Sequence, residues 1–254
     1  MLDALYISAI GLQAQKEQLD ALANNLANMG TTAYKRQSVD FSTILDRAPA
    51  LGAADPVSAA DARATRRIRL DFTAGPIHAT GRPLDIAIDG AGFLEVELPG
   101  GQTGYSRGGS LQIDANGNLS LTGGQILKAD IRVPQGATDV RILADGSAVA
   151  QMPGEETAML LGQLELVTFS SPECLTYRGD GIVTATDGMA EPTRARPGEG
   201  GTRPLAVQSL EASNINMTDE MVSLMLMQRV YELNSRVAQV ADELMGMSNN
   251  LIRT

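Results

Sequence analysis

The two ends of the chain carry matching apolar heptads, the pattern of helices that pack along a narrow seam. Near the N-terminus leucines recur every seven residues, and the C-terminal stripe alternates spacings of four and three without a break. We expect these seam residues to form a subunit interface. They are Leu5, Leu12, Leu19, Leu22, Leu26, Leu226, Val230, Leu233, Val237, Val240, Leu244, Met247 and Leu251. The spacing predicts a narrow seam along each helix that fits another seam of the same kind, which favours assembly over catalysis; the alternative is the core of a monomeric bundle.

Between the helices the hydrophobic period changes to two. The stretches LDIAIDG and FLEVEL, from Leu84 onward, alternate apolar with acidic residues, as half-buried antiparallel strands do. This alternation places Asp85, Glu95 and Glu97 on a solvated face. Asn116-Gly117 lies between two alternating runs, which is a strong hairpin signal. Several short strands with glycine-rich turns predict a compact antiparallel all-β domain.

These patterns divide the chain into three parts and predict an α+β fold. Residues 1–30 and 217–254 form a discontinuous terminal coiled-coil domain, with Asp3 as the first N-cap and Thr218 or Asp219 as the second. Residues 31–82 and 193–216 form an extended arm or connector, much of it rich in Ala, Asp and Pro. Residues 83–192 form the β-rich domain.

Composition excludes several functional classes. The chain has 254 residues and a net charge of −10, which argues against nucleic-acid binding because a phosphate-tracking surface needs basic clusters. No apolar run approaches the roughly 20 residues that span a bilayer, so we expect no direct membrane insertion. The N-terminal residues lack a basic segment, a compact apolar core and a small-residue cleavage site, which predicts that no signal peptide is cleaved.

The residues that carry chemistry are too few or wrongly spaced for an active site. His78 is the only histidine and Cys174 the only cysteine, so a Ser-His-Asp triad, a cysteine cage and an internal disulfide are not expected. The run from Asp114 to Asn118 imitates the start of a calcium loop, but its glycine and closing acid are misplaced. Gly90 and Gly92 lack the third glycine of a dinucleotide fingerprint. We therefore expect no enzyme activity, no cofactor and no metal.

Three groups of motifs, in order along the chain, resemble one family. The first is Ala23–Asn28 (ANNLAN) followed by Tyr34-Lys35-Arg36. The second is Gly81–Phe93 with Tyr105–Ser110 (YSRGGS). The third combines the runs Ser213–Asn216, Glu220–Val222 and Gln228–Ser235. At these residues the chain is similar to the rod and hook proteins of the bacterial flagellum.

This resemblance implies a function, partners and a location. It implies a structural axial protein that assembles with itself into a helical tube, in which the two terminal helices pair as a coiled coil lining the inside and the β domain lies outside. Such a protein transmits torque from motor to hook, forms part of the export channel, and contacts other rod, hook and ring proteins. It would reach the periplasmic rod of the basal body through the flagellar type III export apparatus without cleavage. The chain length and the stretches LQAQKEQLDALANNLAN, YKRQSVDF and GQLELVTF favour the distal rod branch, with the proximal rod branch as the alternative.

An alternative from a different class is a β-domain protein that binds or cleaves the cell wall and dimerises through its helices. It is suggested by the peptidoglycan layer that a flagellar rod must cross. The lack of an acid/base or nucleophile constellation argues against the cleaving form of this alternative.

Overall fold

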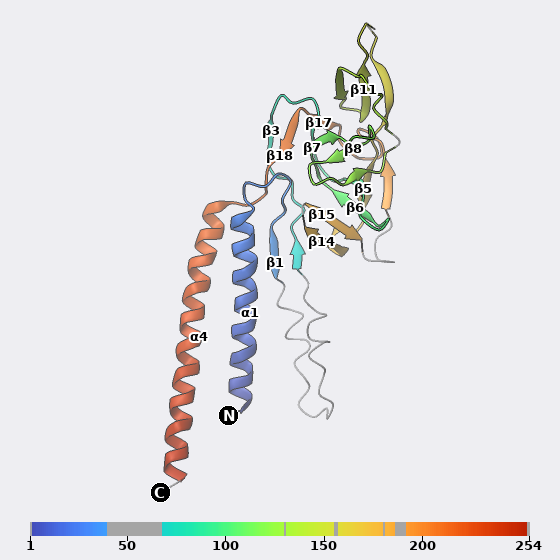
Figure 1. Cartoon of the computed structure of the whole chain (residues 1–254). Helices are drawn as coiled ribbons and strands as arrows, with labels where there is room; N and C mark the ends of the chain where they lie inside the picture. Colours follow the sequence, from blue (N-terminus) through green and yellow to red (C-terminus); the bar gives the residue numbers. More distant parts are fainter. Residues whose placement is uncertain are drawn as a thin grey trace. The chain divides into compact units, whose positions relative to one another are not determined.

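A computed structural model describes residues 2–39, 68–129, 131–154, 157–179, 181–185 and 192–252 of the chain. The chain divides into two compact units. Residues 1–27, 37–69 and 215–254 form the helical unit, and residues 28–36 and 70–214 form the β unit. Figure 1 shows α1 in blue, α4 in red and the strands of the β unit in the colours between them.

The helical unit contains the two α-helices of the described chain and a short two-stranded sheet, except for Leu70, the last residue of that sheet, which belongs to the β unit. The elements are α1 (Leu2–Ala27), α4 (Met217–Ile252), β1 (Gln37–Val39) and β2 (Ile68–Leu70). Helix α4 begins at Met217 because the side-chain oxygen of Asn216 accepts a hydrogen bond from the backbone N–H of Thr218 at 3.1 Å. The N-cap is therefore Asn216, and Asp3 lies within α1. Neither helix of the described chain combines the length and apolar composition needed to cross a bilayer.

The expected pairing of the terminal helices as a coiled coil is wrong. A coiled coil buries the seam of both helices, yet on α4 Leu226 is 59% exposed, Leu233 60% and Val237 60%. The described helices are instead accompanied by mostly antiparallel β-sheet. Heptad spacing establishes which side chains share a face of a helix, but it does not establish what covers that face.

The α1 seam differs from that of α4. Leu22 is buried, whereas Leu12, Leu19 and Leu26 are half-buried. The partly buried apolar residues near the start of α4 are Leu224 and Met227, which lie off the predicted seam. Burial is not described for the side chains of Leu5, Leu244, Met247 and Leu251.

The β unit is built around an eleven-stranded antiparallel sheet. Nine strands follow the order β14-β15-β6-β5-β9-β8-β7-β4-β17, and β13 joins this path by pairing with β5 and β16. The strands are β4 (Asp85–Ile88), β5 (Phe93–Glu97), β6 (Thr103–Ser106), β7 (Gly108–Ile113), β8 (Leu119–Leu121), β9 (Ile126–Leu127), β13 (Leu166–Phe169), β14 (Leu175–Gly179), β15 (Ile182–Ala185), β16 (Pro192–Ala195) and β17 (Leu205–Val207). A short 3₁₀ helix, Pro172–Cys174, precedes β14.

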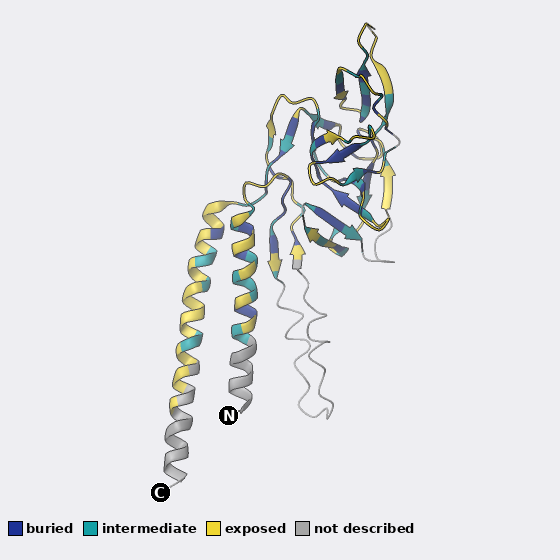
Figure 2. Cartoon of the chain, viewed as in Figure 1, coloured by how far each residue is buried: buried dark blue, intermediate teal, exposed yellow. Residues whose placement is uncertain are grey.

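Two smaller antiparallel sheets complete the β unit. One contains β10 (Asp139–Ile142), β11 (Ser147–Gln151) and β12 (Met159–Gln163), and the other pairs β3 (Ile77–Ala79) with β18 (Ser209–Glu211). The small three-stranded sheet shares its core with the large one. Figure 2 shows the buried residues as dark blue segments of the strands. The main core cluster contains Ile86, Ile88, Leu94, Val96, Leu111, Leu119, Leu121, Leu127, Ile131, Val133, Val140, Ile142, Ala148, Ala150, Leu164, Leu166, Ile182 and Leu205.

The predicted hairpin at Asn116-Gly117 is confirmed, since β7 pairs with β8 across this turn. The Asp114 carboxylate accepts hydrogen bonds from the backbone N–H groups of Asn116 and Asn118 at 2.8 and 2.7 Å. These bonds hold the pKa of Asp114 below its usual value. The run that imitates a calcium loop is thus a turn closed by its own side chain.

The expected solvated carboxylate face is correct only in part. Glu97 is exposed, but Glu95 is nearly buried at its side chain and pairs with Arg194 at 2.9 Å. Asp85 is buried, as is every residue of β4. The Asp85 carboxylate accepts hydrogen bonds from Ser110 Oγ, Thr80 Oγ1 and Arg82 Nε, and these partners replace water around it. The expected arm falls largely on residues 40–67, which lie outside the described residues.

Candidate assembly site

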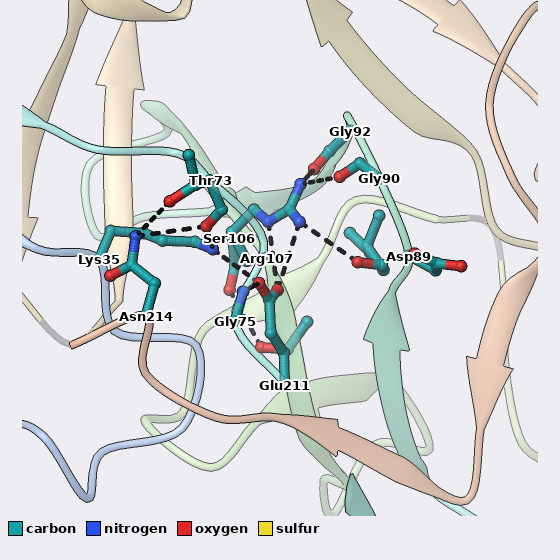
Figure 3. A network of polar contacts seen from close by, with 12 residues as sticks. Lys35, Thr73, Gly75, Asp89, Gly90, Gly92, Ser106, Arg107, Glu211 and Asn214 are labelled. Carbon is teal, nitrogen blue, oxygen red and sulfur yellow. Dashed lines mark hydrogen bonds and ion pairs between the residues drawn. The ribbon is translucent and has the colours of Figure 1, made fainter. Parts of the chain in front are cut away.

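A buried carboxylate, Glu211, ties three separate segments of the β unit together (Figure 3). Its Oε1 accepts hydrogen bonds from Lys35 Nζ at 2.6 Å and from the Gly75 backbone N–H at 2.9 Å. Its Oε2 accepts from Arg107 Nε at 3.4 Å and lies 3.3 Å from Arg107 Nη2. The side chains of Lys35, Arg107 and Glu211 are 5%, 4% and 1% exposed. We call these three residues the Glu211 network.

Arg107 connects this network to the core strands. Its Nη1 donates to the carbonyl oxygens of Gly90 and Gly92, both at 2.7 Å, and its Nη2 donates to Ile88 O at 3.2 Å. The guanidinium carbon also lies 5.6 Å from the centre of the Phe93 ring. Each of the three guanidinium nitrogens therefore has an acceptor, which fixes the side chain in one orientation.

Lys35 occupies the opposite side of Glu211. Its Nζ also donates to the Thr73 carbonyl at 2.7 Å. Burial lowers the pKa of Lys35 below its ordinary value, and the hydrogen bond and negative charge of Glu211 oppose this shift. The neighbouring Tyr34, 2% exposed, meets the Tyr177 ring edge-on with 6.3 Å between the ring centres.

Asn214 adds a second tie between the same segments. Its Oδ1 accepts from the Arg36 backbone N–H at 2.8 Å, and its Nδ2 donates to the Asp71 carbonyl at 2.8 Å. The Ala33 N–H donates to the Glu211 backbone carbonyl at 2.8 Å. The segment after α1, the segment after β2 and the segment before α4 are thus held on the β unit by side-chain and main-chain bonds together.

In the helical unit, a second buried contact involves Asn25 of α1. Its Nδ2 lies 3.4 Å from Glu220 Oε2 of α4, and its amide makes two hydrogen bonds with the backbone of Gln37. Asn25 and Glu220 are 1% and 2% exposed. The ANNLAN motif and the motif that begins at Glu220 therefore meet within this unit.

Lys35, Arg107 and Asn214 belong to the family motifs of the sequence, but Glu211 lies in none of them and was not predicted. No local pattern identifies Glu211, because β18 is a short strand and a glutamate there reads as solvated. The sequence contained only an indirect indication of a buried anion. The motifs contain two cationic side chains, Lys35 and Arg107, and burying both of them requires a buried anion beside them.

An exposed apolar stripe runs along α4, on the residues predicted as the C-terminal seam. Figure 2 shows much of the described part of this helix as exposed. Val230 and Val240 of the stripe are 42% and 54% exposed, in addition to the three residues given above. The neighbouring residues Met221, Val222 and Met225 are 42%, 52% and 58% exposed. Soluble monomers rarely expose a contiguous apolar surface of this kind, so the stripe is a candidate interaction surface.

The predicted chemistry-bearing residues do not converge. His78 is an exposed residue of β3, and Cys174 is half-buried in the 3₁₀ helix before β14. Among the residues that the structure describes, no group of three His, Cys, Asp or Glu side chains is arranged to hold a metal ion.

The β unit is held together by buried charged residues, and helix α4 carries an exposed apolar stripe. These features are typical of a structural protein that assembles with other subunits. Three family models match the chain. "Flagella basal body rod protein" matches residues 5–35, "Flagellar hook protein FlgE/F/G D1 domain" residues 87–150, and "Flagellar basal body rod FlgEFG protein C-terminal" residues 206–251.

Named relatives match over their full lengths. The flagellar basal-body rod protein FlgG of Buchnera aphidicola is 32% identical, over 99% of this chain and 100% of the relative. FlgG of Caulobacter vibrioides is 31% identical, over 98% of this chain and 99% of the relative. The rod protein FlgF of Escherichia coli is 31% identical over 99% of both chains. The chain belongs to the flagellar rod and hook protein family and is a structural rod component of the flagellar basal body, as its motifs predicted.

Proposed function

We propose that the chain assembles with copies of itself into the helical, tubular rod of the flagellum, transmits torque from motor to hook and forms part of the export channel. The observation that carries the proposal is the exposed α4 stripe of Leu226, Val230, Leu233, Val237 and Val240. A stripe with alternating spacings of four and three matches the seam of another helix. A repeated contact with further copies would remove this apolar surface from water.

The interface residues at the two ends of the chain have different parts in this proposal. The α4 stripe supplies the exposed surface, whereas Leu22 of α1 is already buried within its own unit. Leu5, Leu12, Leu19, Leu26, Leu244, Met247 and Leu251 complete the proposed interface on both helices. We propose further contacts with the other rod, hook and ring proteins.

We also propose an export route, a cellular location and a non-enzymatic role for the chain. The chain would leave the cell through the flagellar type III export apparatus without a cleaved signal peptide and act in the periplasmic part of the basal body. Its role would be mechanical and not enzymatic, in keeping with the structural character of the family. FlgG relatives support the distal rod branch, and the FlgF relative keeps the proximal rod branch as the alternative.

Sedimentation of the purified full chain against protein concentration tests self-assembly. The wild-type chain should show a weight-average mass that rises with concentration. Val237→Asp should remain monomeric, because a carboxylate in a buried seam would lose its hydration without a partner. Glu232→Asp, an exposed α4 residue that keeps its charge, is the control and should associate like wild type. A wild-type chain that stays monomeric throughout, or a Val237→Asp variant that associates normally, would refute the proposed interface.

A further inference from the structure

We infer that Glu211 is the coupling residue of this chain: it fastens the segment that leaves α1 and the segment that enters α4 to the core of the β unit. Load on the helical unit would then pass into the strands through one carboxylate and its two cations. The mechanical part of this inference rests on the proposed torque-bearing function. The coupling itself does not.

The course of the chain makes such a coupling necessary. The backbone passes between the two units after residues 27, 36, 69 and 214. Three of the β-unit segments at these crossings meet at the Glu211 carboxylate: Lys35 comes from the first, Gly75 from the second, and Glu211 itself from the third. A twisting load on these crossings pulls the segments relative to one another, and only bonds between them oppose that movement.

The two cations of the network have unequal roles. Arg107 is fixed by carbonyl oxygens of the stretch from Ile88 to Gly92, between β4 and β5, so it belongs to the rigid core. Lys35 belongs to the connector that follows α1. Glu211 joins the connector cation to the core cation, and charge-assisted hydrogen bonds in a buried setting are about twice as strong as neutral ones.

The network also requires an anion at this position. A carboxylate accepts from Lys35, Gly75 and Arg107 at once, since its two oxygens act only as acceptors. A glutamine keeps the size but turns one oxygen into a donor that faces a cation. Glu211→Gln therefore leaves at least one buried N–H group of a cation without its acceptor.

Close packing of the backbone accompanies these bonds. A Cβ added to Gly75 would lie 2.1 Å from the Ala212 carbonyl oxygen, so the second and third segments touch directly beside the carboxylate. The Ala212 N–H also donates to Pro76 O at 2.8 Å. The segments are thus held tightly enough for one side chain to control their relative position.

Hydrogen exchange of the purified full chain tests the coupling. In Glu211→Gln, the Ala33 and Gly75 amides should exchange faster by about tenfold or more, because exchange reports local opening. The amides of β4, β5 and β7 should keep their wild-type rates. Glu97→Gln, which changes an exposed carboxylate of β5, is the matched control and should leave every rate unchanged.

Two results of this experiment overturn the inference. Unchanged exchange at Ala33 and Gly75 would mean that Glu211 does not hold the connectors. A uniform increase across all strands would mean that Glu211 serves only the general stability of the β unit.

Lys35→Met replaces Glu211→Gln as the decisive variant if the latter fails to fold. It removes the connector cation but leaves Glu211 bonded to Arg107 and Gly75. Exchange should increase in residues 33–36 and stay near wild type at Gly75. An equal increase at both places would contradict the division of roles between the cations.

Swimming in media of increasing viscosity tests the mechanical consequence. Cells carrying Glu211→Gln should lose speed more steeply with viscosity than cells carrying Glu97→Gln, and parallel curves would overturn load-bearing by the network. Failure of the proposed function is distinguishable from failure of the coupling. A wild-type chain that never self-associates refutes the former, whereas unchanged exchange in Glu211→Gln refutes the latter.

Discussion

Asn25 and Gln37 are joined by two hydrogen bonds that occupy both polar groups of one backbone position. Asn25 Nδ2 donates to the Gln37 carbonyl oxygen, and Asn25 Oδ1 accepts from the Gln37 N–H, both at 2.9 Å. The side-chain amide thus takes the place of a neighbouring strand beside β1. Because Asn25 is 1% exposed and Gln37 6%, water cannot readily substitute for these bonds.

Asn25→Ala should destabilise the contact between α1 and β1. The substitution leaves the Gln37 N–H and carbonyl without their partner, and a buried unsatisfied group costs about 1–3 kcal/mol. Hydrogen exchange at the Gln37 amide should rise accordingly. Gln13→Ala, at an exposed position of α1 whose side chain donates to Glu17, should leave this amide unchanged. Equal exchange in both variants would show that Asn25 does not support β1.

Gly75→Ala should destabilise the β unit by about 2 kcal/mol or more, because the added methyl would meet a backbone oxygen that cannot rotate away. Gly30→Ala is the control, since a Cβ there meets nothing within 4 Å. Thermal unfolding of the two variants measures the difference. A Gly75→Ala chain that unfolds at the wild-type temperature would show that the segments beside Ala212 separate without cost.

Asp85 should make the stability of the β unit depend on acidity. Burial opposes ionisation of this carboxyl, but its hydrogen bonds outweigh burial and hold its pKa below the usual value. The donors are Ser110 Oγ at 2.6 Å, Thr80 Oγ1 at 2.6 Å and Arg82 Nε at 2.8 Å. The unfolded chain therefore binds a proton at higher pH than the folded chain does, so stability is lost as the pH falls below about 4.

Asp85→Asn tests this dependence. The variant should be less stable than wild type at neutral pH, and its stability should fall less steeply on acidification. Urea unfolding at a series of pH values from neutral to acidic gives both quantities. If the free energy of unfolding depends on pH in the same way for both chains, a carboxylate other than Asp85 controls the loss of stability in acid.

The sequence predicted features that depend on neighbours along the chain. The Asn116-Gly117 hairpin was correct because the turn residues and the alternation that flanks them are close together in the chain. The family motifs were also correct, since they are read directly from residue identities.

Features that depend on distant segments could not be read from the sequence. Asp85 lies in an alternating run, yet it is buried, and its carboxylate accepts a hydrogen bond from Ser110, 25 residues further along the chain. The residues next to Glu211 in the sequence do not indicate its role, because that role depends on Lys35 and Arg107, which lie far from it in the chain. The prediction of a coiled coil was wrong for the same reason. Periodicity identifies an apolar face of a helix, but tertiary structure and assembly decide what packs against that face.

Limited proteolysis should decide where the β domain ends, and residues 83–192 remain a predicted boundary. Strand β17 lies beyond that boundary, yet it pairs with β4 in the register Leu205↔Ile88 and Val207↔Ile86. Removing it would uncover Ile86 and Ile88, which are 0% and 1% exposed, and burial of such side chains stabilises by about 1.5–3 kcal/mol each.

We therefore expect the resistant fragment of the purified chain to retain β17 and to end between β18 and the start of α4. Mass spectrometry of the digest gives the boundary, and exchange of the β4 amides in the isolated fragment reports whether its core is intact. A stable fragment that ends near residue 192 with fully protected β4 amides would show that the shorter domain folds by itself and that β17 only covers it. A fragment that is degraded further whenever β17 is cut away would show that the domain needs this strand and would place its edge after Val207.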